Sequence, residues 1–118
     1  MAIIFHITTR EAFRKEAASY SPEKFQTEGF IHCSTPDQVV KVADARFRGQ
    51  SGLVLLCIET DKVQPEIRYE NLEGGQELFP HIYGELNTDA VLQIVEFAPG
   101  ADGYFTLPAL SHTKSLRN

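Results

Sequence analysis

The run Leu53-Val54-Leu55-Leu56-Cys57-Ile58 is the longest apolar stretch of the sequence. A strand that is apolar on both faces is covered on both sides, so this run predicts the central strand of a sheet. The run is much too short to cross a bilayer, which takes roughly 20 apolar residues in a helix. We therefore expect no membrane association.

Further elements are predicted on either side of this central strand. Apolar residues recur at strand spacing in four segments, residues 3–8, 29–34, 66–70 and 91–97. A helix is expected after each of the first two. One follows the capping box Thr8-x-x-Glu11 and ends at Pro22, and the other begins at Thr35. Two early helices followed mostly by strands predict an α+β fold and not a series of parallel βαβ units.

The chain is short and acidic. It has 118 residues, with 11 Lys and Arg against 16 Asp and Glu, and so a formal net charge of −5. This length predicts one globular domain over residues 1–110. A polar tail follows, residues 111–118, which we expect to be disordered. Nucleic acid is an unfavourable partner for an acidic domain, because affinity for its backbone comes from clustered cations.

The two cysteines, Cys33 and Cys57, each lie inside an apolar run. Buried thiols are the simplest interpretation, because two cysteines make no disulfide scaffold. The N-terminal residues Met1–Phe5 lack the positive charge that opens a signal peptide. These features together predict a cytoplasmic protein.

One histidine pattern occurs twice. Residues 6–13 and 32–39 both follow the order histidine, apolar, hydroxyl, hydroxyl, any residue, acid, any residue, apolar. In each copy the histidine stands near the end of a predicted strand, shares a face with the hydroxyl two residues later, and precedes a predicted helix. The residues concerned are His6, Thr8, His32, Ser34 and Thr35.

The physical chemistry of such a junction favours an anion or a sugar. A helix N-terminus offers unpaired N–H groups and a partial positive charge. Hydroxyl and imidazole groups beside it add donors for a phosphate, a ribose hydroxyl or a carboxylate. An imidazole also exchanges protons near neutral pH, which allows acid–base chemistry. The alternative interpretation is structural, since Ser and Thr before a helix are commonly plain N-caps.

A third histidine, His81, lies in the segment Phe79-Pro80-His81-Ile82-Tyr83-Gly84. Proline and glycine bracket it, which predicts a fixed backbone outside a regular ladder. Three histidines raise the question of a metal, but the sequence has no HxH, no HExxH and no cysteine pair at finger spacing. No metal is therefore expected. Glu85, just past this segment, is the acidic residue best placed for catalysis.

These strings carry a family resemblance. A family of small bacterial proteins of unknown function has motifs similar to three stretches of this chain, Phe5–Thr8, Gly29–Pro36 and Phe79–Gly84. The resemblance runs over residues 4–107. It implies an ADP-ribosylation type of fold, with a split, mainly antiparallel β core and helices beside it. The wider superfamily includes NAD-dependent ADP-ribosyltransferases and an RNA 2′-phosphotransferase.

The resemblance also implies roles for individual residues. His6 matches the position that lies against the nicotinamide ribose of NAD, and His32 matches the nicotinamide side. Where the transferases carry a glutamate, this chain has His81, and Glu85 would have to stand in. The expected catalytic residues are therefore His6, His32, His81 and Glu85. The expected ligand contacts are His6, Thr8, His32, Ser34, Thr35, His81 and Tyr83.

Two hypotheses follow. The first is a site for a small nucleotide-like ligand, NAD or an ADP-ribose derivative, in an enzyme that resembles a glycosyl or ADP-ribosyl transferase or a phosphotransferase. The second is a non-catalytic binding module that keeps the fold. Convergence of His6, His32 and His81 in one pocket favours the first hypothesis. Histidines that are buried and paired with backbone carbonyls favour the second.

Overall fold

The structure, a computed structural model, describes residues 2–109. The predicted tail, residues 111–118, lies outside the described residues. The strands are β1 (Ile3–Thr9), β2 (Ser19–Tyr20), β3 (Ile31–His32), β4 (Leu53–Glu59), β5 (Glu66–Glu70), β6 (Phe79–Tyr83), β7 (Leu86–Asn87) and β8 (Val91–Phe97). The α-helices are α1 (Phe25–Glu28) and α2 (Val39–Arg46), and two short 3-10 helices are η1 (Thr60–Lys62) and η2 (Thr88–Ala90).

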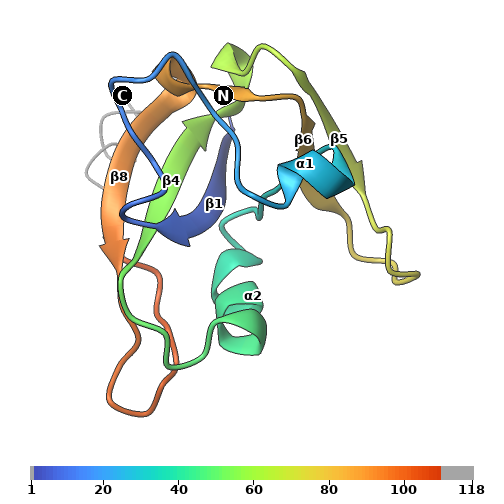
Figure 1. The fold of residues 1–118 in the computed structure, drawn as a ribbon. Coiled ribbons are helices and arrows are strands. Elements are labelled where there is room, and N and C mark those ends of the chain that lie inside the picture. The colour runs from blue at the N-terminus through green and yellow to red at the C-terminus, as the bar shows by residue number, and fades with distance from the viewer. Residues whose placement is uncertain (1, 110–118) are drawn as a thin grey trace.

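The strands form antiparallel sheets in the orders β1–β4–β8, β2–β7 and β3–β6–β5 (Figure 1). Only two short α-helices accompany them in residues 2–109. The predicted α+β class with mainly antiparallel strands is therefore confirmed. The helices do not form the predicted pair at the N-terminus, for reasons given below.

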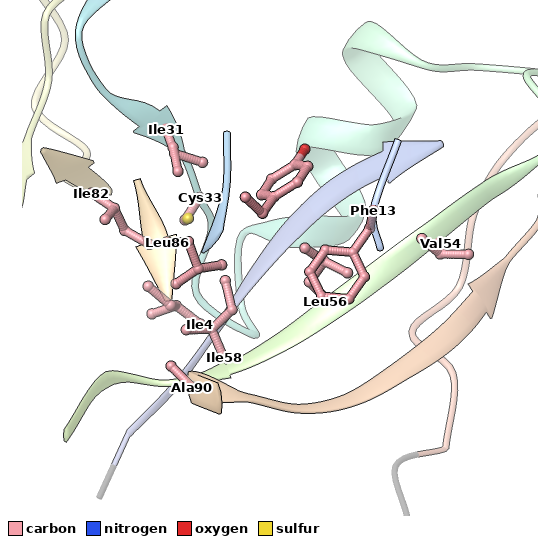
Figure 2. Close-up of a cluster of buried hydrophobic side chains, with 11 residues drawn as sticks. Ile4, Phe13, Ile31, Cys33, Val54, Leu56, Ile58, Ile82, Leu86 and Ala90 are labelled. Atoms are coloured by element: carbon pink, nitrogen blue, oxygen red, sulfur yellow. The ribbon is translucent and has the colours of Figure 1, made fainter. Parts of the chain in front are cut away.

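Strand β4 is the centre of the first sheet, and each of its residues is buried. Alternate side chains of a strand point to opposite faces, so β4 contributes side chains to two apolar clusters. One cluster, shown in Figure 2, takes Val54, Leu56 and Ile58, and the other takes Leu53, Leu55 and Cys57. The prediction of a central strand covered on both faces is confirmed.

Helix α2 covers the second of these clusters. Val39 and Ala43 are fully buried in it, together with Phe5 of β1 and Phe97 of β8. The helix begins at Val39, later than the predicted start at Thr35, because the intervening residues form a turn. Among residues 2–109, no helix has the length and apolar character needed to span a bilayer.

The helix predicted between Thr8 and Pro22 is wrong. Strand β1 runs on to Thr9, and the Arg10 amide still donates to the Gly52 carbonyl at 3.1 Å. Thr9, expected in the first helical turn, therefore belongs to the sheet, and residues 10–18 contain turns and bends and no helix. Tyr20 is extended in β2. Sheet contacts override the local capping signal here, as tertiary context commonly overrides helix propensity.

Strand β6 is the middle strand of the third sheet. This corrects the prediction that the backbone around His81 lies outside a regular ladder. Pro80 is accommodated because its carbonyl still accepts a hydrogen bond, at 3.0 Å, from the amide of Cys33. Strand β3 on its other side is shorter than the predicted strand over residues 29–34.

In the part of the chain that the structure describes, one isolated bridge joins the first and third sheets. The amide of Phe5 donates to the carbonyl of Ser34 at 2.7 Å, and the amide of Ser34 donates to the carbonyl of Phe5 at 2.8 Å. This bridge brings β1 to the end of β3. His6, the residue after Phe5, is thereby placed beside His32.

Candidate functional site

A cleft of about 270 Å³ is lined by residues of the first and third sheets, α2 and the loop after β5. His6 of β1, His32 of β3 and His81 of β6 all line it. The structure therefore brings the three histidines singled out in the sequence into one cleft, and their roles in binding or catalysis stay predictions.

His32 and His81 stand directly opposite each other in the register of β3 and β6. Directly opposite side chains lie on the same face of an antiparallel pair. The centroids of the two imidazole rings are 5.2 Å apart, and the ring planes make an angle of 77°. The two differ in access, since the side chain of His32 is 52% exposed and that of His81 only 6%.

Glu70 of β5 holds His81. The Nδ1 atom of His81 lies 2.8 Å from Oε2 of Glu70, and the hydroxyl of Tyr83 donates to the same oxygen. These hydrogen bonds from Tyr83 and His81 lower the pKa of Glu70, so its carboxylate is ionised at neutral pH. A carboxylate accepts only, so Nδ1 carries a hydrogen, and in the neutral form of the ring Nε2 is an acceptor. The acceptor Nε2 is left for a ligand.

Phe30 packs against the imidazoles of His32 and His81. Its ring is stacked on His81, with centroids 4.4 Å apart and planes at 25°, and it lies 4.8 Å from the ring of His32. It also contacts Tyr83, with ring centroids 5.2 Å apart. Aromatic pairs at these separations are favourable and directional. Phe30 therefore fixes the orientation of the pair.

Glu28 supplies the partner of His32. Oε1 of Glu28 lies 2.9 Å from Nε2 of His32. Gly29 ends α1 with a φ of 80°, the left-handed conformation typical of glycine after a helix. The chain then turns into β3, and this turn brings the two side chains together. His32 and His81 thus each have a carboxylate of their own.

His6 uses both ring nitrogens inside the protein. Nδ1 lies 2.7 Å from the backbone oxygen of His32, and Nε2 lies 2.8 Å from the hydroxyl of Tyr20. A carbonyl accepts only, so Nδ1 carries the hydrogen and Tyr20 donates to Nε2. The Tyr20 oxygen also lies 3.0 Å from the hydroxyl of Thr8. Burial lowers the pKa of His6 to about 4, so its ring is neutral at pH 7.

This network makes His6 a link between β1, β2 and β3. A neutral imidazole with both nitrogens occupied has no hydrogen bond left for a ribose. The predicted contact of His6 with a ligand is therefore not the contact that this geometry favours. A buried histidine paired with a backbone carbonyl is the arrangement expected under the second hypothesis, the non-catalytic binding module.

The remaining predicted site residues divide between the cleft and its surroundings. Ser34 lines the cleft. Tyr83 is outside the lining but is bonded to Glu70. Thr8 lies behind His6 through Tyr20, and the carbonyl of Thr35 accepts hydrogen bonds from the turn before α2.

Glu85 lies outside the cleft. Its side chain is exposed, and its carboxylate accepts a hydrogen bond of 2.7 Å from the hydroxyl of Ser19. The helix N-terminus expected directly after His6 does not exist, because the chain there continues β1. Within residues 2–109, no group of three or more His, Cys, Asp and Glu side chains is arranged to hold a metal ion.

Sequence reasoning missed Glu28, Glu70 and Arg46, which also line the cleft. Glu28 contacts His32 only because the chain turns at Gly29 between α1 and β3, and a predicted strand over residues 29–34 gave no sign of this contact. Glu70 pairs with His81 only through the register of β5 and β6, which no local pattern reveals. Arg46, on α2, is exposed and bonded to Glu73 at 2.9 Å.

The comparisons with known proteins identify a family. The family model described as "Protein of unknown function (DUF952)" matches residues 4–94. The chain belongs to the DUF952 family. The predicted membership of a family of unknown function is thereby confirmed. No curated protein matches the chain.

A solved structure has a similar fold. Protein CC0527 from Caulobacter crescentus, seen by X-ray crystallography, is 30% identical to this chain, with a TM-score of 0.78, and the match covers 89% of this chain and 94% of that one. The solution NMR structure of CC0527 gives 31% identity, a TM-score of 0.76 and coverage of 88% and 91%.

Proposed function

We propose that the cleft binds a small nucleotide-like ligand, NAD or an ADP-ribose derivative, and that His32 and His81 provide acid–base chemistry there. The observation that carries the proposal is the pairing of these two imidazoles across β3 and β6, each with its own carboxylate. An imidazole whose second nitrogen is oriented by a carboxylate has a defined tautomer, as catalytic and ligand-holding histidines require.

His81 is the stronger candidate for holding a hydroxyl. Its Nδ1 hydrogen is fixed on ionised Glu70, so Nε2 accepts a hydrogen bond from a ribose hydroxyl or takes its proton. Tyr83 holds the carboxylate of Glu70 in place, and Phe30 holds the imidazole of His81. His32 is more exposed and is positioned to exchange protons with solvent. The two rings thus lie in different environments, which suits a proton donor and a proton acceptor in the same reaction.

The size and lining of the cleft suit part of a dinucleotide. Its volume of about 270 Å³ is near the lower end of small-molecule sites, which begin at about 300 Å³. Phe5, Ile7 and Phe79 give it apolar surface, and the histidines and carboxylates give it polar groups. A nucleoside portion fits inside, and the rest of the ligand lies over the rim.

The resemblance to the ADP-ribosylation superfamily suggests the reaction class. In a transferase-like reaction, the bond from the ribose C1′ of NAD to nicotinamide breaks and a bond to an acceptor oxygen forms. Nicotinamide leaves as a neutral molecule, and the acceptor's proton passes to Nε2 of His81. The carboxylates that line the cleft are Glu28, Glu70 and Glu73, so these replace Glu85 as candidates for charge stabilisation.

A phosphotransferase-like reaction is the other form of the proposal. Such chemistry needs cations for the phosphate, and Lys24 and Arg46 are the Lys and Arg residues that line the cleft. The short reach of the cleft and the charge of −5 favour a small nucleotide over RNA in either case.

A non-catalytic binding module is the alternative function, and one observation favours it. His6, the residue expected against the ribose, is sealed into a network with the His32 carbonyl and Tyr20. A module predicts ligand binding in the cleft without turnover. Release of nicotinamide from NAD, measured over hours at saturating protein, separates the enzyme from the module.

Calorimetric titration with NAD and with ADP-ribose tests the binding itself. We expect measurable heat for the wild-type chain, and a loss of about tenfold in affinity for His32→Ala, since one hydrogen bond to the ligand is removed. Glu85→Gln is the matched control, because Glu85 lies outside the cleft and should leave affinity unchanged. Absence of heat for both ligands at millimolar concentration contradicts the proposal.

A further inference from the structure

An ion pair joins two residues of the cleft lining. Nη2 of Arg46, on α2, lies 2.9 Å from Oε2 of Glu73, in the loop between β5 and β6. Both residues line the cleft, and both side chains are exposed. The pair therefore joins two different walls of the cleft across solvent.

The loop that carries Glu73 is held independently of Arg46. The side-chain oxygen of Asn71 accepts hydrogen bonds from the amides of Glu73 and Gly75, at 2.9 and 3.1 Å. Its Nδ2 atom donates to the carbonyl of Glu77 at 2.7 Å. The backbone of the loop is thus fixed by Asn71, and the Glu73 side chain is the part that reaches across.

The charges of the cleft single out Arg46. Of its three carboxylates, Glu28 is bonded to His32 and Glu70 to His81, so both are used in orienting imidazoles. Within residues 2–109, the side-chain carboxylate of Glu73 is bonded only to Arg46. An exposed ion pair contributes little to stability, because water solvates both partners well. The Arg46 guanidinium is therefore available to a better anion.

We infer that Arg46 binds a phosphate group of the ligand and that Glu73 occupies this place until the ligand arrives. This inference rests on the proposed function and deepens it, because it requires a ligand with a phosphate at the α2 end of the cleft. A guanidinium presents a planar fork of donors that matches two phosphate oxygens. Phosphate therefore displaces a singly bonded carboxylate, and Lys24, also in the cleft lining, adds a second cation.

A second ion pair provides a matched control. Nζ of Lys41 lies 2.9 Å from Oε2 of Glu77 and joins the same helix to the same loop. Neither residue is part of the cleft lining. Glu77→Gln changes the net charge and breaks one helix–loop ion pair, just as Glu73→Gln does, but leaves Arg46 paired.

The test is a calorimetric titration of wild type, Glu73→Gln, Glu77→Gln and Arg46→Gln with ADP-ribose and with adenosine, which has no phosphate. We expect Glu73→Gln to tighten ADP-ribose binding by up to about fivefold, because the competing carboxylate is gone. Arg46→Gln should weaken it by about tenfold or more. Glu77→Gln should match wild type, and adenosine affinity should be the same in all four proteins.

Three results bear on the inference. ADP-ribose affinities that follow the expected order support it. Equal ADP-ribose affinities in Glu73→Gln, Glu77→Gln and wild type overturn the inference, while the proposed function stands because the ligand binds. If neither ADP-ribose nor adenosine binds to any of the four proteins, the proposed function and the inference are overturned together.

Discussion

The ring centroids of His32 and His81 lie 5.2 Å apart across the β3–β6 pair. The two side chains come from segments separated in the sequence, and the antiparallel register alone makes them neighbours. Each ring is oriented by a carboxylate, Glu28 for His32 and Glu70 for His81. This arrangement is the centre of the proposed site.

Replacement of Glu70 tests how His81 is oriented. Glu70→Gln removes the charge that fixes the hydrogen on Nδ1, and we expect ADP-ribose affinity to fall by about tenfold. Glu66→Gln is the control, because Glu66 lies on the same strand and its side chain pairs with Arg68 instead. Calorimetry measures both. Equal affinities for the two variants mean that Glu70 does not support the site.

The buried network of His6 makes stability depend on pH. The unfolded chain binds a proton on His6 below about pH 6.5, whereas the folded chain does so only below about pH 4. The free energy of unfolding therefore falls as the pH is lowered from 6.5 to 4, by an amount on the order of 3 kcal/mol. Urea unfolding at a series of pH values measures this slope.

The variant His6→Gln isolates the contribution of this residue from that of the carboxylates. Glutamine has no proton to gain in this range, so the variant should lose less stability than wild type between pH 6.5 and 4. Parallel curves for the two proteins would falsify the assignment of a neutral, buried His6.

The hydroxyl of Tyr20 is predicted to stabilise the fold through His6 and Thr8. Tyr20→Phe leaves Nε2 of His6 buried without its partner and should cost about 1–3 kcal/mol of unfolding free energy. Tyr69→Phe is the matched control, because Tyr69 is 48% exposed, and it should change stability by less than about 0.5 kcal/mol. Chemical denaturation distinguishes the two, and similar losses in both variants contradict the network.

The cysteines should be inert in the folded chain. Cys33 and Cys57 are free and buried, and burial raises the pKa of Cys33 well above its usual range and that of Cys57 to about 12. The thiolate is the reactive form, so a thiol-specific reagent at pH 8 should label neither residue until denaturant is added. Rapid labelling of the native protein at one or both thiols is the opposite result.

Much of the fold follows from local sequence. The run from Leu53 to Ile58 marks the central strand, because a strand apolar on both faces has no other place. The helix expected after Thr8 does not form, and the reason is non-local. The amide of Arg10 donates to the carbonyl of Gly52, which extends the pairing of β1. Local capping signals carry no information about a strand that arrives much later in the chain.

The site was predictable in part. The doubled histidine pattern drew attention to His6 and His32, and the segment with His81 added the third, and all three line one cleft. The pattern did not reveal that His6 is sealed by Tyr20, because Tyr20 belongs to the segment expected to be helical. Glu70 was equally hidden, since its position depends on the pairing of two strands.

The most direct measurement is a nitrogen-15 NMR titration of the wild-type chain with ADP-ribose. The account predicts shifts concentrated at Phe30, His32 and His81, including the imidazole nitrogens of the two histidines. Ser19 and Glu85 should be unchanged because they lie outside the cleft. Signals that do not move at millimolar ligand, or that move only outside the cleft, would contradict the account.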